Sequence, residues 1–122
     1  MGCTKLNGSP ACGNKVQNFY STFRHCSNLT GAPIIGPNVT NAALAYDECS
    51  KMKGTPSVGA KTTDMNFTYS NCSNLTGSPV TSESVVGMRY TYRGCTNLTG
   101  RPVIGNNVVL ADFSYYGCPK LT

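Results

Sequence analysis

Residues 72–94 read CSNLTGSPVTSESVVGMRYTYRG, and residues 95–117 read CTNLTGRPVIGNNVVLADFSYYG. With the cysteine counted as position 0, both stretches carry Leu at position 3, Gly at 5, Pro at 7, Val at 13 and Tyr at 20. The pattern continues in both directions, with cysteines 23 residues apart at Cys3, Cys26, Cys49, Cys72, Cys95 and Cys118. A fixed period without insertions predicts that each repeat forms one coil and that equivalent positions stack on one another.

The repeat extends along the chain and predicts a single repeat domain over residues 1–122. Its coils are residues 3–25, 26–48, 49–71, 72–94 and 95–117, followed by a partial coil, 118–122. Only 12% of the residues are charged, and Gly and Pro are frequent, which favours turns and extended segments over long helices. We therefore expect a mainly β fold, a right-handed solenoid of five coils with one short parallel strand per coil.

A second segment of each coil, positions 13–20, is open to two interpretations. The stretch Met65-Asn-Phe-Thr-Tyr69 alternates with a period of two, which indicates a strand. Positions 13, 16 and 20 also match one face of a helix. The β-branched and aromatic neighbours favour an extended or single-turn segment, and the choice between a strand and a helical turn stays open.

Positions 0, 3, 8, 13, 16 and 20 hold mostly apolar or small residues and predict the inward face of each coil. The predicted core ladder comprises the six cysteines named above, Leu29, Leu75, Leu98, Tyr46, Tyr69, Tyr92 and Tyr115. Stacked, equivalent cysteines project parallel Cβ bonds, whereas a disulfide needs converging bonds and a zinc site needs a tetrahedral set. We therefore expect free, buried thiols in this ladder and at Cys12, with no metal.

The columns Cys-x-x-Leu, an apolar residue at position 8, Val at 13, an apolar residue at 16 and an aromatic at 20 resemble the BspA-type leucine-rich repeat of bacterial surface proteins. The stretch Val39-Thr-Asn41 and the elements beginning at Met65 and Met88 are similar to the related Mycoplasma-lipoprotein repeats. The resemblance covers residues 2–122. It departs at position 6, which lacks the family's branched apolar residue, and at the proline, which precedes position 8 instead of following it. The resemblance implies leucine-rich-repeat-like coils and a role in adhesion or surface display.

Groups suited to catalysis are scarce in this sequence. His25 is the only histidine, and the five acidic residues fall at five different repeat positions. The chain has no nucleophile elbow, no phosphate-binding loop and no metal-spaced cluster. We therefore expect no enzymatic activity and no cofactor.

Charge and hydropathy narrow the possible partners. The net charge of +5 is spread along the chain without a run of basic residues, which disfavours nucleic acid. No apolar stretch approaches a membrane span, and no signal peptide is visible, so we expect no membrane insertion. A protein or a glycan surface remains as the expected partner.

The outward positions 17 and 21 vary from repeat to repeat, whereas their inward neighbours do not. Several residues there are Tyr or Arg, which are frequent in binding hot spots. The candidate partner-binding face comprises Tyr20, Arg24, Arg89, Arg93, Asp112 and Tyr116.

These features predict a non-enzymatic structural or binding module displayed on a bacterial cell surface or a phage virion. One variant is a virion component, such as a capsid decoration or tail-fibre protein. A competing interpretation is an intracellular inhibitor or adaptor that binds one host protein through the same face. Because the sequence shows no capping segment at either end of the array, we also expect self-association or neighbouring chains there.

Overall fold

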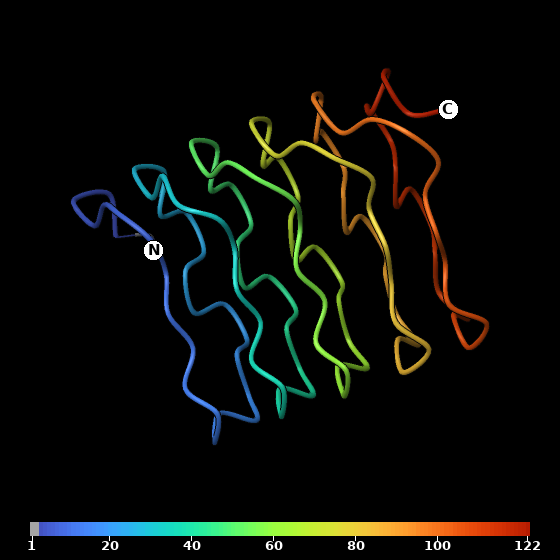
Figure 1. Ribbon diagram of the computed structural model, residues 1–122, viewed down its shortest axis with the longest axis horizontal. Helices are drawn as coiled ribbons and strands as arrows, with labels where there is room; N and C mark the ends of the chain where they lie inside the picture. Colours follow the sequence, from blue (N-terminus) through green and yellow to red (C-terminus); the bar gives the residue numbers. More distant parts are fainter. Residues whose placement is uncertain (1–2) are drawn as a thin grey trace.

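The computed structural model describes residues 3–122. They form a stack of coils in chain order, with the first and the last coil at opposite ends of the molecule (Figure 1). Each coil is hydrogen-bonded to the next through the backbone. The Phe19 amide donates to the Asn41 carbonyl at 2.8 Å, and the Leu44 amide donates to the Asn66 carbonyl at 2.9 Å. Each of these bonds joins residues that are 22 apart in sequence, so equivalent positions of neighbouring coils lie side by side.

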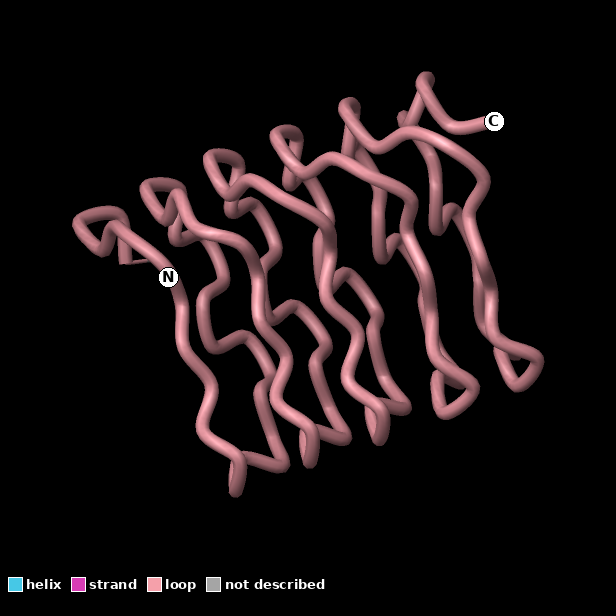
Figure 2. Tube along the Cα trace, in the orientation of Figure 1, coloured by secondary structure: helices cyan, strands magenta, loops and turns pink. Residues whose placement is uncertain are grey.

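Residues 3–122 contain no helix and no strand, and the tube in Figure 2 is loop throughout. The only β pairing within these residues is a set of isolated parallel bridges between coils, such as Asn41 with Asp64 and Asp64 with Gly87. The prediction of a mainly β solenoid with one parallel strand per coil is therefore wrong. With no helix in this part of the chain, none is present that could cross a membrane.

Strands are absent from the second segment of each coil because β-turns take their place. The sequence had left the conformation of this segment, positions 13–20, open. The Thr68 amide donates to the Met65 carbonyl at 3.1 Å, and the Cys72 amide donates to the Tyr69 carbonyl at 3.1 Å. The third residue of each turn, Phe67 and Asn71, has a φ of 59° and 61°. A positive φ at that place is the arrangement of a type II turn. A residue with a positive φ is not in the extended conformation of a strand, so no strand runs through these turns.

The turns of successive coils are stacked in a fixed register. Amides at positions 16, 18, 20 and 22 donate to carbonyls at positions 15, 17, 19 and 21 of the following coil. For example, the Phe67 amide donates to the Arg89 carbonyl at 2.8 Å, and the Tyr69 amide donates to the Thr91 carbonyl at 2.9 Å. This register aligns side chains of one repeat position into columns along the stack.

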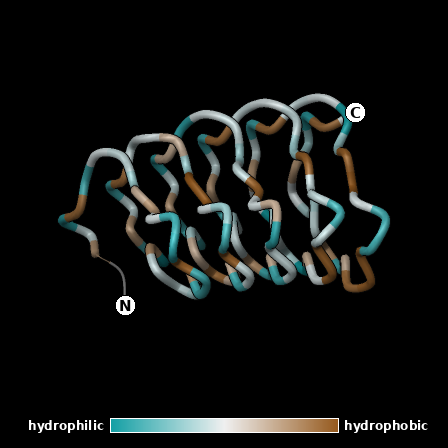
Figure 3. The backbone as a smooth tube through the Cα atoms, turned by 60° about the horizontal axis from the view of Figure 1, so that its bottom comes forward, coloured by the Kyte–Doolittle hydropathy of each residue, from teal (hydrophilic) through white to brown (hydrophobic). Residues whose placement is uncertain are grey.

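The core lies inside the coils, and its largest members are the tyrosines at position 20. Tyr46, Tyr69 and Tyr92 are fully buried, and their ring centroids lie 5.7 and 5.8 Å apart along the column. Leu29, Leu75 and Leu98 are buried at position 3. Figure 3 shows the apolar segments recurring at equivalent points of successive coils.

Position 8 faces outward, contrary to our prediction, and position 9 faces inward in its place. Ile34 is 43% exposed and Val80 is 47% exposed, whereas Ile35 is buried. The preceding prolines explain the difference: Pro33 and Pro79 are buried at position 7. In an extended segment successive side chains point to opposite sides, so a buried position 7 turns position 8 to the solvent.

Cysteines at position 0 donate to the carbonyl 26 residues earlier, which lies three residues before the preceding cysteine of the column. The Cys72 thiol donates to the Tyr46 carbonyl at 3.0 Å, and the Cys95 thiol donates to the Tyr69 carbonyl at 3.1 Å. All seven cysteines of the chain are free, and the four from Cys26 to Cys95 in the column are buried. The prediction of buried thiols is wrong for Cys3, which is exposed, and for Cys12 and Cys118, which are partly buried, because all three lie in the end coils. Burial raises the pKa of the Cys49 thiol to about 12 and holds that of Cys72 well above its usual value. The thiols in the middle of the stack therefore stay protonated and act as hydrogen-bond donors between coils.

Candidate functional site

The candidate site begins with an unusual choice of residues at position 18, the third residue of the first turn. Phe67, Tyr90 and Phe113 occupy it in the last three coils, with φ values of 59°, 55° and 55°. A bulky residue is rare in this left-handed region, which glycine enters freely, and the strain is of the order of 1–3 kcal/mol per residue. At the equivalent place of the second turn, the last two coils use Gly94 and Gly117.

The three aromatic side chains form a stack on the outside of the coils, which we call the aromatic ladder. The ring centroids of Phe67 and Tyr90 lie 4.7 Å apart with planes 13° from parallel. Those of Tyr90 and Phe113 lie 5.2 Å apart with planes 14° from parallel. Such pairs contribute about 0.5–1.5 kcal/mol each, which offsets part of the backbone strain. The ladder remains accessible, and Phe113 is 57% exposed.

Arg93 and Tyr116 complete an open hollow beside the aromatic ladder. The guanidinium carbon of Arg93 lies 5.7 Å from the centre of the Tyr90 ring, beside the stacked rings. Tyr116 meets Phe113 edge to face, with ring centroids 5.9 Å apart. These two residues and the ladder line a hollow of about 460 Å³.

A second hollow of about 370 Å³ continues the first toward the N-terminal coils. The two hollows share Phe67 and Arg93. The remaining lining of the second hollow is more polar and consists of Arg24, Leu44, Asp47, Glu48, Ser70 and Asn71. We call the two hollows together the lateral groove. One part of the groove is aromatic, the other carries charged and amide groups, and Arg93 lies between them.

Arg93 differs from the other arginines of this face in having no acidic partner. Arg24 is paired with Asp47 through Nε and Oδ2 at 3.1 Å, and Arg89 is paired with Asp112 at 3.1 Å. Within residues 3–122 no carboxylate pairs with Arg93, which contacts the Tyr90 ring instead. The groove therefore presents one cation that a ligand could neutralise.

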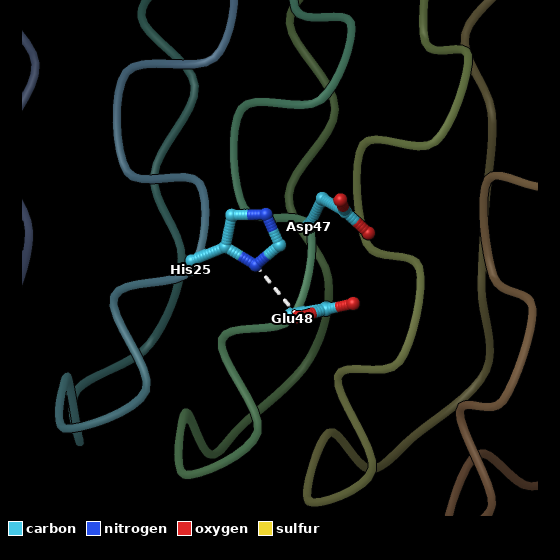
Figure 4. Close-up of side chains that lie close together, drawn as sticks. All are labelled: His25, Asp47 and Glu48. Atoms are coloured by element: carbon cyan, nitrogen blue, oxygen red, sulfur yellow. Dashed lines mark hydrogen bonds and ion pairs between the residues drawn. The ribbon is translucent and has the colours of Figure 1, made fainter. Parts of the chain in front are cut away.

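His25, Asp47 and Glu48 lie at the edge of the groove and are the residues best suited to hold a metal ion. Their potential ligand atoms lie within 4.8 Å of one another, and imidazole and carboxylate groups are ligands of zinc. However, His25 Nδ1 bonds to Glu48 Oε2 at 2.6 Å across two coils (Figure 4), and Asp47 is held by Arg24. A cation would have to compete with the Arg24 guanidinium for Asp47. The arrangement is better described as one ion pair, Arg24 with Asp47, beside one histidine–carboxylate hydrogen bond.

The structure brings together only part of the binding face expected from the sequence. Arg93 and Tyr116 line the first hollow, and Arg24 lines the second. Arg89 and Asp112 pair with each other at 3.1 Å and line neither hollow. Tyr20 is exposed on the first coil, outside both hollows.

The aromatic ladder, which is the centre of the groove, was not predicted from the sequence. A signal was present, because position 18 changes from Ser21 and Leu44 to an aromatic residue in three successive repeats. In a strand that residue would point to the same side as positions 16 and 20 and would therefore be predicted as core. The turn geometry places it on the outside of the coil instead.

Comparison of the chain with protein-family models, with curated proteins and with solved structures found no match. Membership in the BspA-type repeats therefore stays an expectation based on the sequence columns. The case for a function is carried by the lateral groove and the chemistry of its residues.

Proposed function

We propose that the protein is a non-enzymatic repeat module that binds a partner through the lateral groove, in adhesion or assembly at a bacterial or phage surface. The observation that carries this proposal is the unpaired Arg93 beside a partly exposed aromatic ladder. Tyr and Arg are the residue types enriched in binding hot spots. A virion component or an intracellular inhibitor would use the same groove with a different partner.

The cost of the aromatic ladder to folding supports a role in binding. Bulky residues occupy a left-handed position at Phe67, Tyr90 and Phe113, although glycine is free of strain there. Their rings are partly exposed, so burial in the core does not account for them. What the rings gain is a rigid contact surface, because each is fixed by its neighbour in the stack. A preorganised surface loses less conformational entropy when a partner binds.

Selection of ligands by the wild-type protein, followed by point variants, tests the proposal. The probes are a displayed library of random dodecapeptides and an array of bacterial glycans. Phe113→Ser uses the residue that the first coil carries at this position, Ser21, and it removes the outer ring of the ladder. We expect selected ligands to bind this variant about tenfold or more weakly, since a buried aromatic contact contributes over about 1.4 kcal/mol at a hot spot.

The matched control is Val109→Thr, which changes a side chain that is 76% exposed and lies outside the groove. Thr40 and Thr63 occupy the same repeat position, so the substitution suits the coil. Binding should be unchanged in this variant. Ligands that bind the wild type and both variants equally, or the recovery of no ligand from either collection, would contradict the proposed function.

A further inference from the structure

Given the binding function proposed above, we propose that the occupant of the lateral groove is a segment of a partner protein that carries a carboxylate beside an apolar side chain. The carboxylate pairs with the Arg93 guanidinium, and the apolar side chain rests on the aromatic ladder. Three features of the groove lead to this ligand: the orientation of the rings, the distribution of charge, and the amide group in the second hollow.

The orientation of the rings distinguishes a protein from a sugar. Carbohydrate rings stack on the free faces of aromatic side chains. In the aromatic ladder Tyr90 is stacked between Phe67, at 4.7 Å, and Phe113, at 5.2 Å, so both faces of Tyr90 and one face of each neighbour are covered. Tyr90, at the centre of the ladder, therefore offers its ring edge to a ligand. Ring edges pack well against aliphatic side chains and against the faces of other aromatic rings.

The distribution of charge selects an anionic group. Arg93 has no acidic partner within residues 3–122, and its contact with Tyr90 holds the guanidinium between the two hollows. The nearby acids are already bonded, Asp47 to Arg24 and Glu48 to His25. A guanidinium binds a carboxylate through two parallel hydrogen bonds. A nucleic-acid backbone would need several such cations in a row, and the groove has one that is free.

The second hollow offers a group that suits a peptide main chain. Asn71 lines it next to Arg93, and its side-chain amide lies beside Gly94 without a hydrogen bond to any residue of the described part of the chain. An amide provides both a donor and an acceptor, which match the N–H and C=O of an extended peptide. A peptide whose acidic side chain reaches Arg93 can therefore place its backbone along Asn71 and its apolar side chain on Phe67 or Tyr90.

An NMR titration of the whole chain with defined probes tests this inference. The acidic probe is the peptide Gly-Asp-Leu-Phe-Asp-Gly with blocked ends, and its matched control replaces both Asp residues with Asn. A trimer of galacturonic acid supplies carboxylates on a sugar scaffold. We expect the acidic peptide to shift the amide resonances of Phe67, Tyr90 and Arg93, and to bind about tenfold more tightly than either other probe.

Arg93→Gln should reduce the affinity for the acidic peptide about tenfold, because a charge-assisted pair is lost. Arg101→Gln is the control, since Arg101 is exposed, lacks an acidic partner among residues 3–122 and lies outside the groove. Equal or tighter binding of the sugar or the Asn peptide at the groove would overturn the protein partner but keep the binding function. Absence of shifts at the groove with all three probes would overturn both.

Discussion

Individual side chains make the coils differ from one another, and the tyrosines at position 20 show how. The Tyr69 hydroxyl accepts a hydrogen bond from the Ser57 amide at 3.0 Å and donates to the Ser57 carbonyl. Tyr92 occupies the same column, but its buried hydroxyl has no partner in the part of the chain described here. The equivalent backbone of coil four, at Val80, is bridged to Val103 of the next coil instead. The same hydroxyl therefore stabilises one coil and is left unsatisfied in another.

This difference predicts opposite effects of one substitution. Tyr69→Phe should lower the free energy of unfolding by about 1–2 kcal/mol, because the Ser57 amide and carbonyl lose their partner. Tyr92→Phe should leave it unchanged or raise it, because it removes a buried hydroxyl that has no partner. Urea unfolding of both variants gives the comparison. Equal destabilisation by the two substitutions would contradict this account of the tyrosine column.

At the scale of the element, the stacked β-turn is the building unit of the molecule. Each turn is closed by its own hydrogen bond and joined to the next coil by others. The turn requires a positive φ at its third residue. In the first three coils six different residue types meet this requirement at positions 18 and 22: Ser21, His25, Leu44, Glu48, Phe67 and Asn71. Tertiary stacking, and not local preference, therefore holds these residues in the left-handed region.

Local strain at this position is measurable. Ser21 has a φ of 56°, and Ser21→Gly should raise the free energy of unfolding by about 0.4–1 kcal/mol. Gly117→Ala, at a φ of 77° and with only ordinary contacts for the added carbon, should lower it by at least that amount. Ser50→Gly, where φ is not positive, serves as the control and should be destabilising. Thermal unfolding of the three variants measures these effects, and a destabilising Ser21→Gly would refute the strain at position 18.

The same turns explain how much of the fold and site the sequence could predict. The 23-residue period, the burial of Leu75 and Tyr69, and the free thiol column follow from repeated residues. The turns do not, because the alternation of Met65, Phe67 and Tyr69 matches a strand and no glycine marks the positive φ at position 18. The buried proline at position 7 determines that position 8 points outward and position 9 inward. Hydrophobicity alone does not reveal this, because positions 8 and 9 are both mostly apolar. For the same reasons the sequence predicted that Arg93 and Tyr116 lie on the surface, but it did not predict that the aromatic ladder lies there too.

At the scale of the whole molecule, the lateral groove exists only because the coils are stacked in register. Phe67, Tyr90 and Phe113 come from three different coils, and Arg93 is positioned by the ring of the residue three before it. In a repeat array, stability is the sum of coil stabilities and interfaces between neighbours. A slip of one residue between two coils would break the row of amide–carbonyl bonds and separate the rings.

The hydrogen bonds between coils are the most direct test of this account, and NMR detects them through the scalar coupling between an amide nitrogen and the carbonyl carbon that accepts its bond. The structure predicts couplings from the Phe67 amide to the Arg89 carbonyl and from the Tyr90 amide to the Asp112 carbonyl, each 22 residues later in the chain. Observation of these couplings, repeated from coil to coil, would support the stack. Couplings from the same amides to carbonyls four residues earlier, as in a helix, or to a different register of the neighbouring coil, would contradict it.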